Sequence, residues 1–407
     1  MKNSKNFKKG GVSIFIVMVV GVLVSIMSAS FLRLMFRDQE QASKLDLSQS
    51  AYDSAQAGVE DAKRFLRIFR SACGASGTGS FEGVTYNCNA MRDAIQNESC
   101  YTLATAGIGN PNGETIIQTT SGAGGASNDA SLNQAYTCVK LRMNTADFLG
   151  RTNDGSPSVI NLRGTAAFNR VRIRWHSREN MTNGNNIALD SLSNPSVRPR
   201  IDSRNWRNQN RPAILKAQFY GYVPGVGGSS SIMDTPYPDD GNGASEMLFY
   251  PTNSTSALSS NVSDMPTVRR NESSSQATTD YTFTRCSDRM DANSNAYACE
   301  TTVNIGRSVR PNDVLYLRLT PLMNDSNFRV ELLNGDNVVD FDGVQPKVDS
   351  TGRANTQLRR VESRIGFNDT SFPVPLFSAQ TESNEEPICK EFSVTRLTNS
   401  NVNCRNQ

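Results

Sequence analysis

Histidine is nearly missing from this chain, in which His176 is the only one among 407 residues. Catalysis by a Ser/His/Asp or Cys/His set would therefore depend on a single residue that follows a predicted strand in a polar, arginine-rich stretch. No reactive nucleophile motif accompanies it. We expect a solvent-exposed histidine at the end of a strand, in a protein that is not an enzyme.

Motifs that bind zinc or nucleotides are also missing. The eight cysteines show no Cys-x-x-Cys spacing, which argues against a zinc site. The chain has no Gly-x-x-x-x-Gly-Lys-(Ser/Thr) motif, and Gly107, Gly109 and Gly113 lack the preceding strand and following helix of a dinucleotide-binding turn. We therefore expect no metal and no cofactor.

One segment resembles the opening of an EF-hand calcium loop. Its Asp291, Asn293 and Asn295 place oxygen ligands at alternate positions, as a hard cation requires. However, Ala296 stands where that loop needs glycine, and Thr302 stands where it needs a bidentate glutamate. We interpret the segment as an Asn/Asp-rich turn without calcium.

Neither sign of charge is in large excess, since 42 Lys and Arg residues face 39 Asp and Glu residues. The net charge of +3 includes four lysines in the first nine residues, so a chain without these residues has a charge near −1. This balance gives no global basic field for nucleic acid or anionic lipid. Abundant Asn, Ser, Thr and Gly fit an exposed, β-rich extracellular protein.

A local basic cluster surrounds Trp206, with Asp202 as its one carboxylate. Guanidinium groups that reach phosphates, beside a ring that stacks on bases, would suit DNA binding. Because the cluster is isolated, we favour a solvated loop face and keep DNA as the alternative. The cluster consists of Arg198, Arg200, Arg204, Trp206, Arg207 and Arg211.

Charged residues are entirely absent from Val12 to Leu32. The run is long enough to span a bilayer core of about 30 Å, and it continues without proline into a helical pattern that reaches about Arg70. Such a helix would be roughly 90 Å long at a rise of about 1.5 Å per residue. The run is therefore a candidate membrane segment.

Three interpretations of this segment compete. A removable signal peptide needs a shorter apolar core of about 7 to 15 residues. A permanent signal anchor is supported by the lysines before the span and by Arg33 and Arg37 after it. The third interpretation is a prepilin segment that a peptidase cuts before the apolar run.

Two stretches favour the third interpretation. The sequence Lys-Lys-Gly-Gly-Val-Ser-Ile-Phe-Ile at 8–16 resembles a type IV prepilin junction, with cleavage after Gly11 (or Gly10), so that Val12 becomes the new amino terminus. The Ala-Gly-Val-Glu sequence at 57–60 resembles the end of the amino-terminal helix in PilX-type minor pilins. The resemblance covers about the first 70 residues.

The resemblance implies a prepilin peptidase, a pilus assembly platform and other pilins as partners, the last through the amino-terminal helix. Small residues on that helix, Gly21, Ser25 and Ala29, would allow close helix contacts. Major pilins carry glutamate at the fifth mature position, where this chain has Ile16 (Phe15 if the cut follows Gly10). That departure favours a position at or near the tip, because a tip subunit needs no such partner above it.

Beyond the membrane segment, small and apolar residues recur at spacings of three and four along the predicted helix. We expect this stripe to pack against a globular head, and a free-standing coiled coil is the less favoured alternative because the stripe is short. The stripe is Ala51, Ala55, Val59, Ala62, Leu66 and Phe69.

Alternating apolar residues predict strands at 135–143, 168–175, 214–223, 246–250, 281–285, 297–305, 314–320 and 328–333. Asn334-Gly335 and Asp342-Gly343 are hairpin-type turn sequences. The segments at 176–212 and 225–280 contain few apolar residues and are expected to be mobile loops. The cysteines fall as sequence neighbours, which suggests extracellular disulfides, although eight cysteines leave the connectivity open: Cys73 with Cys88, Cys100 with Cys138, Cys286 with Cys299, and Cys389 with Cys404.

We therefore predict an α+β protein, in which a long hydrophobic helix packs on an antiparallel pilin-like head with a β-sandwich insertion. The expected parts are a leader at 1–11, a membrane and assembly helix at 12–70, a cysteine-containing crossover at 71–139, a β-rich sandwich-like domain at 140–346, and carboxy-terminal pilin-head strands with a cystine loop at 347–407. The predicted function is that of a minor pilin, which lies in the cell membrane before assembly and in an extracellular pilus afterwards. The alternative is an uncleaved, membrane-anchored adhesin or carbohydrate-binding protein on the cell surface.

Overall fold

The fold is known from a computed structural model, which describes residues 11–74, 77–111, 113–117, 133–182, 184–190, 205–222, 243–253, 261–264, 282–290 and 297–366. The chain divides into two compact units. Unit 1 comprises Met1–Leu141 and Val348–Ser363, and unit 2 comprises Arg142–Lys347 and Arg364–Gln407. Residues 142–347 of unit 2 are thus inserted between the two stretches of unit 1.

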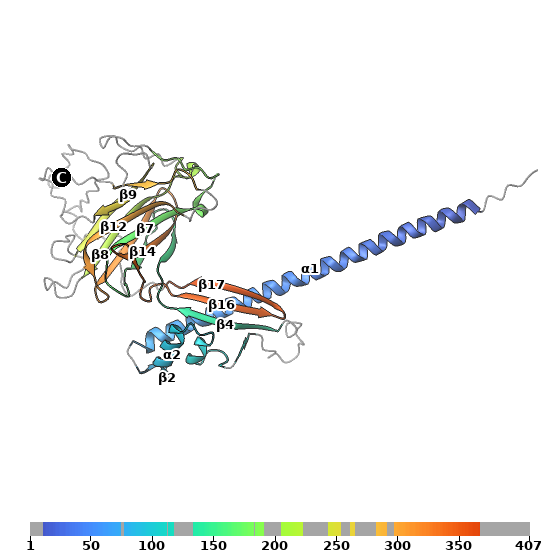
Figure 1. The fold of residues 1–407 in the computed structure, drawn as a ribbon, viewed down its shortest axis with the longest axis horizontal. Coiled ribbons are helices and arrows are strands. Elements are labelled where there is room, and N and C mark those ends of the chain that lie inside the picture. The colour runs from blue at the N-terminus through green and yellow to red at the C-terminus, as the bar shows by residue number, and fades with distance from the viewer. Residues whose placement is uncertain are drawn as a thin grey trace, which may run out of the picture. The chain divides into compact units, whose positions relative to one another are not determined.

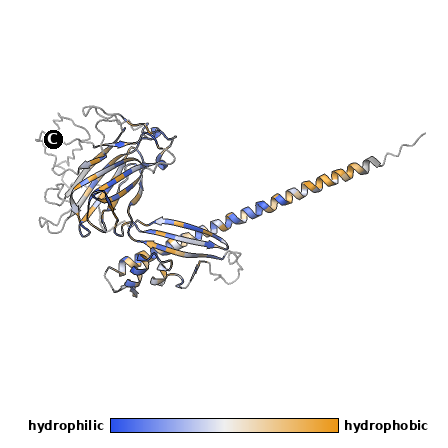
Figure 2. Ribbon diagram, viewed as in Figure 1, coloured by the Kyte–Doolittle hydropathy of each residue, from blue (hydrophilic) through white to orange (hydrophobic). Residues whose placement is uncertain are grey.

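The longest element of unit 1 is helix α1, which runs from Gly11 to Ala72 and confirms the expected helix (Figure 1). Its two halves differ in environment. The large apolar side chains from Phe15 to Phe36 are exposed, whereas Ala51, Ala55 and Ala62 are completely buried. Figure 2 shows the hydrophobic residues concentrated in the amino-terminal part of α1.

The buried half of α1 packs on a four-stranded sheet, in the order β17-β16-β4-β3. The strands are β3 (Thr115–Ile116), β4 (Gln134–Arg142), β16 (Lys347–Ala354) and β17 (Gln357–Arg364). Two glycines permit a close approach of helix and sheet. A Cβ on Gly352 would collide with the backbone of Ala51 and Ala55, and one on Gly58 would collide with Ser350 Oγ.

The predicted stripe is therefore the sheet-facing side of α1, and the coiled-coil alternative does not apply to this half of the helix. Phe69 is only half-buried, whereas Phe65 and Ile68, which the stripe did not include, are buried. The buried face is wider than a seam of one residue per turn, because the helix lies against a sheet and further segments of unit 1.

Between α1 and β4, unit 1 is built from short elements and two disulfides. A hairpin of β1 (Thr78–Phe81) and β2 (Val84–Asn87) leads into α2 (Cys88–Gln96). The Asn87 side chain caps α2 by accepting a hydrogen bond from the Ala90 N–H at 3.1 Å. A 3₁₀ turn, η1 (Thr102–Ala106), follows.

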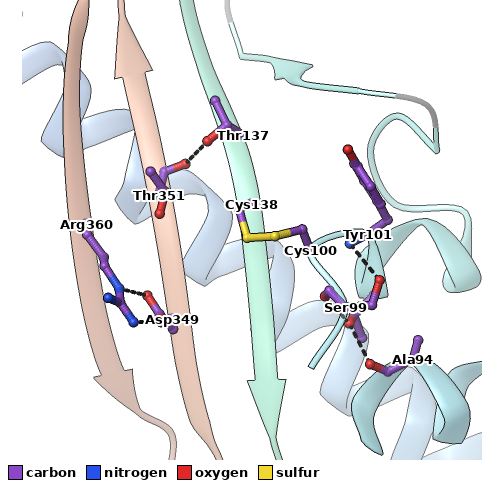
Figure 3. Close-up of a disulfide and its surroundings, with 10 residues drawn as sticks. Ala94, Ser99, Cys100, Tyr101, Thr137, Cys138, Asp349, Thr351 and Arg360 are labelled. Carbon is purple, nitrogen blue, oxygen red and sulfur yellow. Dashed lines mark hydrogen bonds and ion pairs between the residues drawn. A yellow bond between two sulfur atoms is a disulfide. The ribbon is translucent and has the colours of Figure 1, made fainter. Parts of the chain in front are cut away.

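The disulfides of unit 1 join Cys73 to Cys88 and Cys100 to Cys138. The first fixes the end of α1 to the start of α2, and the second ties the segment before η1 to β4 (Figure 3). Closing a loop of about 15 residues contributes on the order of 3 kcal/mol in the chain-entropy model. These bonds hold a region that has short strands and little apolar area.

Unit 2 contains one eleven-stranded sheet, with the order β15-β14-β7-β12-β11-β9-β8-β13-β6. Two further strands lie off this path, where β5 pairs with β14 and β10 pairs with β12. The bounds are β5 (Phe148–Thr152), β6 (Ser158–Asn161), β7 (Phe168–Ser177), β8 (Ile214–Tyr222), β9 (Gly243–Asn253), β10 (Val262–Asp264), β11 (Thr282–Cys286), β12 (Tyr297–Val309), β13 (Val314–Leu322), β14 (Ser326–Asn334) and β15 (Asn337–Val339).

This continuous sheet differs from the predicted sandwich, which has two separate sheets. The two halves of the sheet join at a single residue pair of β11 and β12, Cys286 opposite Cys299, which is also a disulfide. Buried residues from both halves belong to one hydrophobic cluster, so the sheet curls around a common core. Alternation alone cannot tell a sandwich from a curled sheet, because both bury every second side chain.

The turn and loop predictions have mixed outcomes. Asn334-Gly335 does connect two paired strands, β14 and β15, whereas Asp342-Gly343 follows the isolated bridge at Phe341 and joins no hairpin of the described strands. The expected loops at 176–212 and 225–280 contain β9, β10 and the buried Trp206. Low apolar content therefore did not exclude strands or buried positions.

Candidate functional site

The largest exposed apolar surface of the described residues is the amino-terminal half of α1. Every large hydrophobic side chain from Phe15 to Phe36 is exposed, at 43% to 70% of its full area. By length and composition α1 is able to cross a membrane, and its most apolar part is not buried. Such an extended apolar surface is unfavourable in water and fits lipid or other apolar helices.

Two serines in this apolar half make hydrogen bonds within the helix. The Ser25 hydroxyl donates to the Gly21 carbonyl at 2.8 Å, and the Ser30 hydroxyl donates to the Ile26 carbonyl at 2.9 Å. In hydrocarbon these internal bonds avoid the cost of an unpaired hydroxyl group. The segment can therefore enter lipid without an external hydrogen-bond partner for these two serines.

The residues expected to mediate helix contacts lie on one side of this segment. Gly21, Ser25 and Ala29 follow one another at intervals of four residues along α1, so they share a helix face. A Cβ on Gly21 would meet no atom within 4 Å, and Ile16 at the expected fifth mature position is 55% exposed. This face is open to a neighbouring helix.

The expected processing site lies at the edge of the described chain. Gly11 and Val12 form the first turn of α1, and Gly10 lies outside the described residues together with the rest of the predicted leader. At the other end of the apolar segment, Arg33 and Arg37 introduce the first charges. The side chains from 37 to 46 are exposed, and packing on the sheet becomes complete at Ala51.

The arginine cluster around Trp206 has a different geometry from the one expected for DNA binding. Trp206 is 1% exposed, and its indole N–H donates to the Pro212 carbonyl at 2.9 Å. Its ring packs edge-on against Tyr250 and lies under the Arg211 guanidinium, with the Arg211 Cζ atom 5.1 Å from the ring centre. In this conformation the Trp206 ring cannot stack on a base.

Two of the arginines in that cluster bind carboxylates of the protein. Arg211 makes two hydrogen bonds of 3.1 Å to Asp190, and Arg207 lies 3.2 Å from Asp325. Arg198, Arg200 and Arg204 lie outside the described residues. The described part of the cluster therefore stabilises the fold. The sequence alone did not reveal that these arginines pair with aspartates distant in the chain.

His176 is not the solvated residue that we expected. It is completely buried at the end of β7, with a left-handed φ of 65°. Burial lowers the pKa of the imidazole from 6.5 to about 4, although the backbone of Asn210 opposes this shift. Neither ring nitrogen makes a hydrogen bond of good geometry within the described residues. The sequence pattern missed this burial because the covering residues come from a distant segment.

Arginines on the outward face of β7 form a network of ion pairs. The alternation of this strand predicted a solvated face for these arginines but did not identify their partners. Glu331 is 4% exposed and accepts ion pairs from three arginines: Arg172 at 2.5 Å, Arg329 at 2.9 Å and Arg174 at 3.4 Å. Arg174 also contacts Glu300 at 2.5 Å. These charges are mutually compensated, so the face is polar without a large excess of positive charge.

Other candidate sites gain no support as binding pockets. Asp291, Asn293 and Asn295 lie outside the described residues, as do Cys389 and Cys404. Among the described residues no group of three or more histidine, cysteine or acidic side chains could hold a metal. A hollow beside Tyr136 in unit 1 has a volume of about 10 Å³, which is room for one water molecule.

Comparison of the chain with protein-family models, with curated proteins and with solved structures finds no match. The features of the described residues that bear on function are therefore the exposed apolar half of α1 and the head to which α1 is attached.

Proposed function

We propose that this protein is a minor pilin of the PilX type, a non-enzymatic subunit of a type IV pilus that is located at or near the tip. The observation that carries the proposal is the contrast within α1. One half is an exposed apolar rod, and the other half is buried in a folded head. A subunit that first sits in a membrane and then packs against similar helices requires such a division.

The junction and the helix sequence support this proposal. Val12 begins the helical apolar segment directly after two glycines, which suits removal of the lysine-rich leader by a prepilin peptidase. Because lipid already shields apolar side chains, helix association in the fibre must rely on close packing and on avidity. The open face with Gly21, Ser25 and Ala29 provides a surface for such packing.

The head supports an extracellular role. Three disulfides occur among the described residues, and no described cysteine is free. Disulfides persist in oxidising compartments outside the cytoplasm. In this proposal the head is exposed for adhesion, fibre initiation or DNA uptake, and the pilin-like part of it is the four-stranded sheet that covers the buried half of α1.

A membrane-anchored adhesin that is never cleaved is the second candidate. The observation in its favour is the exposed polar stretch of α1 at 37–46, which follows Arg33 and includes an ion pair of 2.6 Å between Glu40 and Lys44. A permanent anchor would use this stretch as a stalk of about 15 Å, at about 1.5 Å per residue, between membrane and head. Both candidates thus share the structure and differ in processing.

Processing in the presence and absence of prepilin peptidase separates the two candidates. We expect the peptidase to shorten the wild-type chain so that it begins at Val12. Gly11→Ile should block this cleavage, whereas Gly21→Ala serves as the matched control, because a Cβ at Gly21 meets open space. An unchanged wild-type chain that keeps Met1 in the presence of active peptidase would exclude the pilin proposal and leave the anchored adhesin.

A further inference from the structure

A strap packs against the end of β7 in unit 2; Trp175 of β7 donates a hydrogen bond to it, and Trp206, the second tryptophan of the chain, is one of its residues. The strap is defined as residues 205–213, just before β8. The Trp175 indole N–H, from β7, donates to the Ala213 carbonyl at 3.0 Å, and the Trp206 indole N–H donates to the Pro212 carbonyl at 2.9 Å. Both rings are at most 1% exposed.

Polar contacts fix the centre of the strap. The Asn210 side chain accepts a hydrogen bond from the Thr182 N–H at 2.7 Å and donates one to the Asn186 carbonyl at 3.0 Å. Asn324 donates to the Arg211 carbonyl at 2.9 Å. These bonds come from segments far apart in the sequence, so the strap depends on the close packing of several loops.

The single histidine of the chain lies in this packed region, next to the backbone of Asn210. His176 is fully buried, and its backbone N–H donates to Ser326 Oγ at 3.3 Å, which holds the strained left-handed conformation in place. The imidazole makes no hydrogen bond of good geometry within the described residues. A charge on this ring would therefore be poorly solvated while the strap is closed.

Among the described residues, the charged groups on the surrounding elements do not supply a partner for a protonated imidazole. On the strap, Arg207 and Arg211 are cations that pair with Asp325 and Asp190. On the 3₁₀ turn after β7, the carboxylate of Glu179 accepts a hydrogen bond from the Asn327 side chain at 2.6 Å. No ionised side chain is among the causes of the lowered pKa of His176, which are burial and the Asn210 backbone.

We propose that residues 205–213 form an acid-released strap, in which protonation of His176 opens the closed conformation and exposes the two tryptophans. The proposal does not depend on the pilin assignment, since it concerns unit 2 alone. When the strap opens, the imidazole gains water and returns to an ordinary pKa near 6.5, whereas the closed form has a pKa of about 4. The open form binds the proton more readily, so falling pH favours opening.

The size of the effect follows from these two pKa values. Between pH 7 and pH 5 the equilibrium constant for opening should rise by about 20-fold, and it should level off below about pH 4, where both forms are protonated. Hydrogen exchange of the Trp175 indole N–H measures this constant, because its acceptor, the Ala213 carbonyl, belongs to the strap, whereas the Trp206 bond to Pro212 lies within the strap. In the full-length chain in detergent, labelled with ¹⁵N-tryptophan, the Trp175 indole resonance is the one to follow.

The matched variant is His176→Asn. Asparagine tolerates the left-handed conformation better than other residues and does not titrate. We expect indole protection, corrected for intrinsic exchange, to fall by about 20-fold from pH 7 to pH 5 in the wild type and to stay constant in the variant. The pairs of Arg207 and Arg211 with aspartates are present in both proteins, so they do not distinguish the variant from the wild type.

Two results would overturn the proposal. One is unchanged protection of the wild-type Trp175 indole between pH 7 and pH 5, and the other is an equal loss of this protection in His176→Asn. If the variant does not fold, the single imidazole resonance of the wild-type chain decides. A titration midpoint near pH 4 supports a buried ring under the strap, whereas a midpoint near 6.5 shows a solvated ring and contradicts the proposal.

Discussion

Gly352→Ala should selectively destabilise the packing of α1 on the four-stranded sheet. The added methyl group would collide with the backbone of Ala51 and Ala55 and would lie 2.8 Å from the Ser54 carbonyl carbon. Backbone atoms cannot move away by changing a rotamer, so helix and sheet must separate. Overpacking of a core costs about 1 to 3 kcal/mol, and we expect a value of about 3 kcal/mol because the collision involves backbone on the helix side.

The assay is hydrogen exchange of the α1 segment at 51–68 in the full-length chain, compared with unfolding of unit 2. Both tryptophans belong to unit 2, so their fluorescence reports that unit separately. Gly74→Ala is the control, since its Cβ would meet no atom within 4 Å and its φ is not positive. If Gly352→Ala kept wild-type protection at 51–68, the described contact between α1 and β16 would be wrong.

Three further substitutions test other parts of the structure. Glu331→Gln should destabilise unit 2 by about 2 kcal/mol in urea unfolding, because three arginines lose a nearly buried carboxylate. Glu300 is more exposed, so Glu300→Gln should cost less than about 1 kcal/mol. Equal effects of the two substitutions would contradict this difference. Replacing Cys286 and Cys299 together by serine should lower the unfolding free energy of unit 2 by on the order of 3 kcal/mol, and an unchanged midpoint would show that the junction of the two sheet halves does not need the bond. Burial raises the pKa of Tyr136 to about 12, so the folded form keeps the phenol proton while the unfolded form loses it above about pH 10. The stability of unit 1 should therefore fall as pH rises from 10 to 12. Tyr136→Phe should remove that loss in an alkaline unfolding titration.

The sequence predicted the long elements well, because their patterns repeat over many residues. The helix expected at 12–70 is found at Gly11–Ala72, and the strand expected at 168–175 is β7, Phe168–Ser177. In β7 the arginines alternate with residues of the core, as expected for a strand with one buried face. Short strands such as β1 and β2 were missed, since four mostly exposed residues show too little alternation.

The connections between strands were less predictable, because pairing is decided by contacts far apart in the sequence. The curled eleven-stranded sheet depends on one residue pair between β11 and β12, and its pattern of apolar residues matches a two-sheet sandwich equally well. Low apolar content likewise did not reveal that Trp206 is buried, since its partners Tyr250 and Arg211 are brought together only by the fold.

The candidate site was predictable to a different degree in each part. The apolar half of α1 follows directly from the absence of charge between Val12 and Leu32, and the structure places that half in an exposed position. The burial of His176 could not be predicted, because the strap that covers it returns from a distant part of the chain. The suggestion that cysteines adjacent in the sequence pair with one another is confirmed for the three disulfides among the described residues.

The central claim is that the exposed apolar half of α1 leaves the membrane to join a fibre after the leader is removed. The most direct measurement is amino-terminal sequencing of this protein recovered from sheared, washed surface fibres, with the cell-envelope fraction analysed in parallel. The account predicts fibre-bound protein that begins at Val12. Fibres that lack the protein, together with envelope protein that still begins at Met1, would contradict it.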